Sequence, residues 1–220
     1  MVTLTILGFF MLLILGTFRL GLSAWAKGES TKGEYQRARI VSQMIFQQLK
    51  SAVPHKVKTQ KAEGDYVVFE GKNRSVKFVS TVSLKARKPS GLVYAFYEFR
   101  EGDAGGGRLV LYEGRVVNKN FLDDPPPEED FLPIFEGLAD VRFEYFREED
   151  SEKNREEGWV EEWNAKEEKE LPAAIRVTLV PREGGWTEES PLQILASVPC
   201  NRHEEIRGGP VRRMLPPVVR

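Results

Sequence analysis

The chain has 220 residues, of which 41% are hydrophobic and 30% are charged, and its formal net charge is -1. This composition is that of a folded protein, and the length suits one domain with an additional segment, or two small domains. Without the first 27 residues, which carry Arg19 and Lys27 and no acidic residue, 30 basic and 33 acidic residues remain, a net charge of -3. This balance argues against nucleic-acid binding through bulk electrostatics.

The N-terminal segment predicts a membrane helix. Its first 18 residues carry no charge, and eleven of them are Val, Leu, Ile or Phe. At about -0.3 to -0.6 kcal/mol each, these eleven supply about -3 to -7 kcal/mol toward membrane insertion. Extension to Ala26 reaches the length that crosses a bilayer, with Arg19 able to snorkel and Trp25 suited to the interface. We therefore predict a transmembrane segment over residues 1–26.

Two alternatives to a membrane helix remain open. Ala24-Trp25-Ala26 fits the small-x-small pattern of a signal-peptide cleavage site, which would leave a soluble chain beginning at Lys27. However, the charged front region is missing and Arg19 interrupts the approach to the site. A buried core helix is disfavoured because the uncharged run lies at the extreme N-terminus.

The orientation of this segment is ambiguous. The basic residues Lys27, Lys32, Arg37 and Arg39 all follow the span. The positive-inside rule would therefore place the body in the cytoplasm, whereas basic residues upstream of Met1 would place it outside.

The next segment, residues 27–53, has the period of an amphipathic helix. Its apolar stripe consists of Ala38, Val41, Ile45, Gln48, Leu49 and Ala52, with Met44 beside it. We expect this stripe to pack on the protein's own sheet and expect Tyr35, Ile40 and Phe46 to lie off it. With Pro54 ending the pattern, one helix is predicted from Met1 to Val53.

The remaining sequence predicts β-strands. Alternating or β-branched segments occur at residues 66–71, 75–81, 91–100, 108–114, 138–148, 174–182 and 192–198. Alternation indicates antiparallel sheets with one solvated face, and no repeated strand–helix–strand pattern occurs. The fold class is therefore α+β, with a β-rich domain over residues 54–200. The Gly-, Pro- and Arg-rich tail, residues 201–220, is predicted to be disordered.

No catalytic, cofactor or metal site is predicted, and we expect no enzyme activity. His55 and His203 lie far apart in sequence, Cys200 is the single cysteine, and no G-x-S-x-G, H-E-x-x-H or C-x-x-C motif occurs. Carboxylates cluster at residues 123–130, 148–157 and 166–170. These clusters are interpreted as solvated linkers, because no EF-hand spacing is present, although calcium binding stays open.

A membrane helix that continues into an amphipathic helix and then a β-rich body is similar to the plan of type IV pilin-like proteins. Prepilins carry a basic leader, then Gly-Phe-Thr-Leu-Leu-Glu-Val, then a run resembling MVTLTILG at residues 1–8. Met1 would fall two places after the family glutamate. The cleavage glycine, the methylated phenylalanine and the glutamate of the family are not in this sequence, so we expect the true start to lie upstream. A basic leader there would place the body outside the cytoplasm.

The body resembles one branch of that group, the minor pseudopilin called general secretion pathway protein J. The resemblance rests on three segments in order: FEGLADVRFEYF at 135–146, GWVEEW at 158–163 and ELPAAIRVTLV at 170–180. The signature residues within them are Tyr145, Phe146, Trp159, Trp163, Leu171 and Pro172. We expect the two tryptophans to cap the core beside an acidic loop.

The resemblance implies a type IV pilin-like fold and a subunit near the tip of the pseudopilus of type II secretion. The implied partners are the I- and K-type minor pseudopilins, the major pseudopilin, the inner membrane and prepilin peptidase, with the body in the periplasm. The residues expected to pack in the assembled helix bundle are Leu4, Leu7, Met11, Ile14, Leu15 and Phe18. Rival readings are a minor pilin of a type IV pilus or competence system, a soluble periplasmic binding protein, and a membrane-anchored enzyme.

Overall fold

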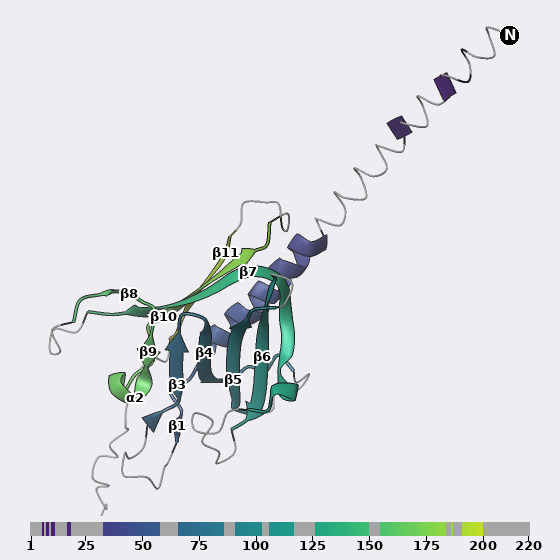
Figure 1. Cartoon of the computed structure of the whole chain (residues 1–220). Helices are drawn as coiled ribbons and strands as arrows, with labels where there is room; N and C mark the ends of the chain where they lie inside the picture. Colours follow the sequence, from purple (N-terminus) through teal and green to yellow (C-terminus); the bar gives the residue numbers. More distant parts are fainter. Residues whose placement is uncertain are drawn as a thin grey trace, which may run out of the picture.

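The computed structural model describes residues 33–57, 66–85, 91–102, 106–116, 126–149, 155–183, 186 and 191–199, and residues 6, 8, 10, 11, 17 and 18. Across these residues the protein is α+β (Figure 1): an N-terminal helix lies against a curled, nine-stranded antiparallel sheet, and a two-stranded sheet lies beside it. The predicted α+β class with antiparallel pairing is confirmed.

The strands follow one another along the chain with two short helical elements between them. They are β1 (Lys56–Val57), β2 (Tyr66–Val67), β3 (Phe69–Lys72), β4 (Ser75–Ser80), β5 (Val93–Arg100), β6 (Gly107–Arg115), β7 (Leu132–Arg147), β8 (Gly158–Val160), β9 (Trp163–Asn164), β10 (Ala174–Pro181) and β11 (Leu192–Ser197). The 3-10 helix η1 (Glu128–Asp130) precedes β7, and α2 (Ala165–Glu168) follows β9.

The large sheet has the order β11-β10-β7-β6-β5-β4-β3-β9, and β8 pairs with the C-terminal end of β7. Every strand segment predicted from the sequence is present, but β7 begins at Leu132, six residues before the predicted segment. Alternation fails there because Gly137 adopts a φ of +72° at a register shift, so Phe135 and Leu138 both reach the core. The acidic stretch 166–170, expected as a linker, instead contributes to α2.

The expectation of a single solvated face is wrong for the middle of the sheet. The concave side holds the main core, which includes Phe78, Tyr97, Leu111 and Phe143. The other side holds a second cluster of buried residues, formed by Tyr66, Val68, Val79, Tyr94 and Phe96. Alternation of polar and apolar residues could not reveal this because β5 is apolar on both faces.

The N-terminal helix crosses the concave side of the sheet, and its described C-terminal part covers residues 33–50. It ends at residue 50 and not at the predicted Val53, because the chain there bonds to β4. The Ser80 hydroxyl donates to the Gln48 carbonyl at 2.9 Å, and Val53 N donates to the Val79 carbonyl at 2.9 Å. Ala52 then forms a β-bridge with Ser80.

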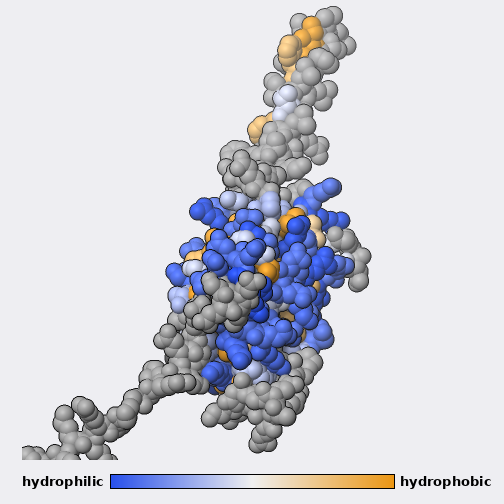
Figure 2. Space-filling model, turned by 90° about the vertical axis from the view of Figure 1, so that its left-hand side faces the viewer, coloured by the Kyte–Doolittle hydropathy of each residue, from blue (hydrophilic) through white to orange (hydrophobic). Residues whose placement is uncertain are grey.

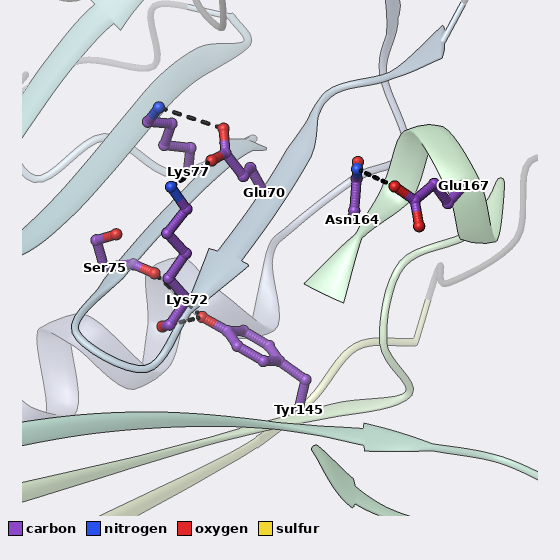
Figure 3. A network of polar contacts seen from close by, with 7 residues as sticks. All are labelled: Glu70, Lys72, Ser75, Lys77, Tyr145, Asn164 and Glu167. Atoms are coloured by element: carbon purple, nitrogen blue, oxygen red, sulfur yellow. Dashed lines mark hydrogen bonds and ion pairs between the residues drawn. The ribbon is translucent and has the colours of Figure 1, made fainter. Parts of the chain in front are cut away.

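The sheet curls until the turn between β3 and β4 meets β7 (Figure 3). The buried Tyr145 hydroxyl donates to the carbonyls of Lys72 at 3.0 Å and Ser75 at 3.2 Å. Phe143 N also donates to the Asn73 carbonyl at 2.7 Å. These bonds join the β3–β4 turn to β7 and so hold the sheet in its curl around the core.

Replacement of Gly71 is expected to break this closure. A Cβ at Gly71 would lie 2.2 Å from Tyr145 Cζ, and the ring cannot retreat without losing its hydroxyl bonds. We expect Gly71→Ala to lower the free energy of unfolding by about 1–3 kcal/mol, the usual cost of overpacking. Gly158→Ala is the matched control, because no atom lies within 4 Å of its Cβ position. Urea unfolding of the chain in detergent measures both, and equal stability of the two variants would contradict the closure.

Candidate assembly surface

The side of the N-terminal helix that faces the sheet is almost completely buried. Ala38, Ile45 and Leu49 have no exposed surface, and Ala52 is 2% exposed. These residues belong to the apolar stripe predicted from the sequence, so the expectation that the stripe packs on the protein's own sheet is confirmed. Met44, placed beside the stripe, is 41% exposed.

One polar residue on this stripe fixes the helix to the sheet. Gln48 is fully buried, and its amide nitrogen donates to the Val82 carbonyl at 2.9 Å and to Glu113 Oε1 at 2.5 Å. Its amide oxygen accepts a hydrogen bond from the Tyr97 hydroxyl. A buried amide that makes all of these bonds avoids the desolvation cost of an unpaired polar group.

Glu113 extends this network to the segment that follows β4. Its carboxylate accepts hydrogen bonds from Ser83 Oγ at 2.7 Å, Leu84 N at 2.7 Å and Lys85 N at 3.0 Å. The sequence placed Gln48 on the stripe but could not pair it with Glu113, because 65 residues separate them. We call Gln48, Tyr97 and Glu113 the polar lock.

Beside the buried stripe, the helix exposes apolar side chains on one side. Ile40 is 62% exposed and Met44, one turn further along, is 41% exposed. The prediction that Ile40 lies off the sheet-facing stripe is confirmed. It is wrong for Tyr35 and Phe46, which are partly buried and pack against the core.

Toward the N-terminus the described residues are helical and apolar side chains are exposed. Met11 is 63% exposed and Phe18 is 65% exposed, and Ile6 and Phe10 are also more than half exposed. Figure 2 shows these hydrophobic residues above a body whose visible face is mainly hydrophilic. Among the residues that the structure describes, no helix combines the length and the apolar character needed to cross a bilayer.

The other predicted assembly residues, Leu4, Leu7, Ile14 and Leu15, lie outside the described residues, as do most of segment 1–26, Cys200 and the tail 201–220. The predicted domain boundaries therefore stay predictions.

Four of the six signature residues lie inside the fold. Tyr145 is fully buried, Leu171 is 1% exposed and Trp163 is 4% exposed. Pro172 is also buried. The Trp163 indole donates to the Glu170 carbonyl at 3.0 Å, which satisfies its polar group. Trp163 therefore caps the core as expected.

The other two lie on the outer face of the sheet. The Phe146 and Trp159 rings are 5.2 Å apart, and the Arg176 guanidinium lies 4.2 Å from the Trp159 ring centroid. Arg176 Nε also donates to Glu144 at 2.6 Å. Trp159 therefore does not cap the core; it lies next to Phe146 on the outer face, where β8 pairs with β7.

A groove runs along one side of the helix where it leaves the domain. One wall is the helix from Glu34 to Val41, and the other is the first part of β7, Pro133–Gly137, together with Arg182, Glu183 and Trp186. Its volume is about 780 Å³. We call it the β7 groove.

Comparison with known families identifies the group to which these features belong. The family described as "Type II secretion system (T2SS), protein J" matches residues 16–190, which include the helix over residues 33–50 and all three signature segments. The chain belongs to this family. None of the curated proteins compared with the chain matches it.

As a T2SS protein J, the chain is a minor pseudopilin. This confirms the resemblance drawn from the signature segments and favours the secretion-system reading over a minor pilin of a type IV pilus. Family membership implies a structural, membrane-associated periplasmic subunit that interacts with other pseudopilins. The functional site of such a protein is a surface, and the exposed helix face with the adjacent β7 groove is the candidate.

The polar lock makes a measurable contribution to stability. Gln48→Ala leaves the Tyr97 hydroxyl without its acceptor and removes a donor from the Val82 carbonyl and from Glu113 Oε1, which keeps Leu84 N. We expect the free energy of unfolding to fall by about 2–4 kcal/mol. Gln47→Ala, at the exposed neighbouring position, should stay within about 0.5 kcal/mol of the parent protein. Urea unfolding monitored by tryptophan fluorescence tests the pair, and similar losses in both variants would contradict the lock.

Buried tyrosines predict a loss of stability at alkaline pH. Burial raises the pKa of Tyr97, and the nearby Glu113 adds to the effect; burial also raises the pKa of Tyr94 and Tyr145. The unfolded chain releases these protons near pH 10 while the folded chain retains them. Stability is therefore complete below pH 10 and falls above it by about 1.4 kcal/mol per pH unit for each tyrosine.

The Tyr97→Phe variant isolates one of these protons. At pH 8 its free energy of unfolding should be lower than that of the parent, because Gln48 loses a hydrogen-bond donor. Above pH 10 its free energy of unfolding should fall less steeply than that of the parent, by about 1.4 kcal/mol per pH unit, because one tyrosine proton is missing. Urea midpoints measured from pH 8 to 11 give both slopes. Identical slopes would show that Tyr97 does not stay protonated in the folded state.

Proposed function

We propose that this protein is a minor pseudopilin at or near the tip of the pseudopilus, where it helps to initiate assembly for protein export across the outer membrane. The observation that carries the proposal is the two-sided character of the helix. One side is locked to the sheet through Gln48, and the other presents Ile40 and Met44 to solvent. A helix fixed in this way offers a preformed apolar stripe to neighbouring subunits.

The N-terminal segment supports the same role. A helix that is apolar all round can exchange lipid contacts for contacts with neighbouring helices at little cost, because both surroundings are equally apolar. The side chains proposed to pack in the bundle are Leu4, Leu7, Met11, Ile14, Leu15 and Phe18. Before assembly, the same segment would hold the protein in the inner membrane as a single span with its β-rich body in the periplasm.

The proposed neighbours are the I- and K-type minor pseudopilins and the major pseudopilin. Interaction with other pseudopilins follows from the family, and a place at the tip fits a chain with a large β-rich body.

A charged residue within the N-terminal segment tests the proposal. Met11→Asp and Ile14→Asp should each cost about 2.5–3.5 kcal/mol of membrane insertion and should block secretion. Met11→Leu keeps the apolar side chain and should secrete normally. Leu195→Asp is the second control, because it adds the same charge on an exposed strand residue outside the helix. Membrane fractionation and the amount of exported substrate are the measurements.

Normal secretion by both Met11→Asp and Ile14→Asp would contradict the proposal that the N-terminal segment anchors the protein and packs in the assembled bundle. Loss of secretion in Leu195→Asp as well would show that the assay responds to any added charge, and the role would then lack support.

A further inference from the structure

The β7 groove exists because β7 changes partners at a kink. Before Gly137 the strand pairs with β6, and from Leu138 it pairs with β10. Gly137 takes a φ of +72°, which favours glycine, and its carbonyl accepts a hydrogen bond from Arg182 N at 3.0 Å. The first part of β7, which is not paired with β10, forms one wall of an open wedge, and the helix forms the other.

The floor of this wedge is apolar. The rings of Phe135 and Trp186 meet edge to face at 4.8 Å, and Ile134 and Val41 are only partly buried beside them. Ile40 forms the outer lip and is 62% exposed. At about 780 Å³ the groove lies within the range of roughly 300–1,000 Å³ that is typical of ligand clefts.

The exposed apolar surface continues beyond the groove along the helix. Met44 lies one turn, about 6 Å, beyond Ile40 on the same side of the helix. An occupant that covers both the groove and Met44 must therefore extend along the helix axis. A compact small molecule would leave Met44 exposed, whereas an amphipathic helix with apolar side chains three and four residues apart would cover both.

The rim argues for a protein and against a lipid surface. The residues that line the groove include three acidic and two basic side chains: Glu34, Glu136, Glu183, Arg37 and Arg182. An anionic membrane would favour a purely basic rim, whereas mixed charges match the polar flanks of another amphipathic helix.

We propose that the β7 groove and the Ile40–Met44 stripe together bind the amphipathic helix of one neighbouring pseudopilin subunit, which lies between the two walls of the groove. This inference rests on the proposed function and adds to it a second contact: the neighbour touches the start of β7 as well as the helix. Arg37 and Arg182 meet acidic positions of that neighbour, and the apolar floor takes its buried side chains.

Photo-crosslinking in the assembled secretion system tests the two walls separately. A benzophenone amino acid replaces Ile40 on the helix wall or Glu136 on the β7 wall of the full chain, co-produced with the other pseudopilins. Arg142, further along β7 on the outer face and 58% exposed at its side chain, is the matched control for Glu136. Both groove positions should crosslink to the N-terminal helix of a pseudopilin, with a yield about ten-fold or more above that of Arg142.

A charge-reversal pair tests the rim. Arg37→Glu should reduce the Ile40 crosslink about ten-fold, because like charges set against the neighbour's acidic positions are costly. Arg39→Glu makes the same charge change on an exposed position that does not line the groove, and it should leave the yield within about two-fold.

The outcomes separate the groove from the proposed function. A crosslink from Ile40 without one from Glu136 would overturn the groove as a binding site and leave helix-to-helix assembly intact. Crosslinks from Glu136 to lipid, to a non-pseudopilin or within the same chain would also overturn it. If neither position crosslinks while Met11→Asp still abolishes secretion, only the groove fails; if Met11→Asp also secretes normally, the assembly role fails with it.

Discussion

The hydrogen bonds of Gln48 with Glu113 and Tyr97 are the interaction on which the assembly surface depends. Apolar packing alone is tolerant of rotation and sliding, since Ala38, Ile45 and Leu49 could meet the sheet in several registers. A buried amide with two fixed partners permits only one. The polar lock therefore determines which side of the helix remains outside, and so places Ile40 and Met44 on the surface of the domain.

The curl of the sheet provides the second constraint. Tyr145 joins β7 to the β3–β4 turn, and the same strand bends at Gly137 and ends in the outer pair of Phe146 and Trp159. One long strand thus closes the core, forms a wall of the β7 groove and supports β8. Two of the six signature residues lie next to each other on this strand: Tyr145 faces inward to the core, and Phe146 faces outward to Trp159 of β8.

Much of the fold could be predicted because strands and the amphipathic helix leave local patterns. The stripe containing Ala38 and Leu49 and the alternation of Ile175, Val177 and Leu179 are such patterns, and both are confirmed. The β7 groove left no such trace, because it requires residues 34–41, 133–137 and 186 to meet in space. The Gly137 kink was the one available signal, but a glycine within a strand is compatible with several structures.

The geometry of the helix and sheet has a mechanical consequence. The helix crosses the concave side of the sheet and is bonded to it near its C-terminal end, so tension on the N-terminal end runs parallel to the contact surface. Contacts loaded in this sliding direction share the force, and a close-packed interior transmits it without yielding. A pull on the N-terminal end of this helix would therefore move the whole β-rich body as one rigid piece, and would not peel the helix from the sheet one turn at a time.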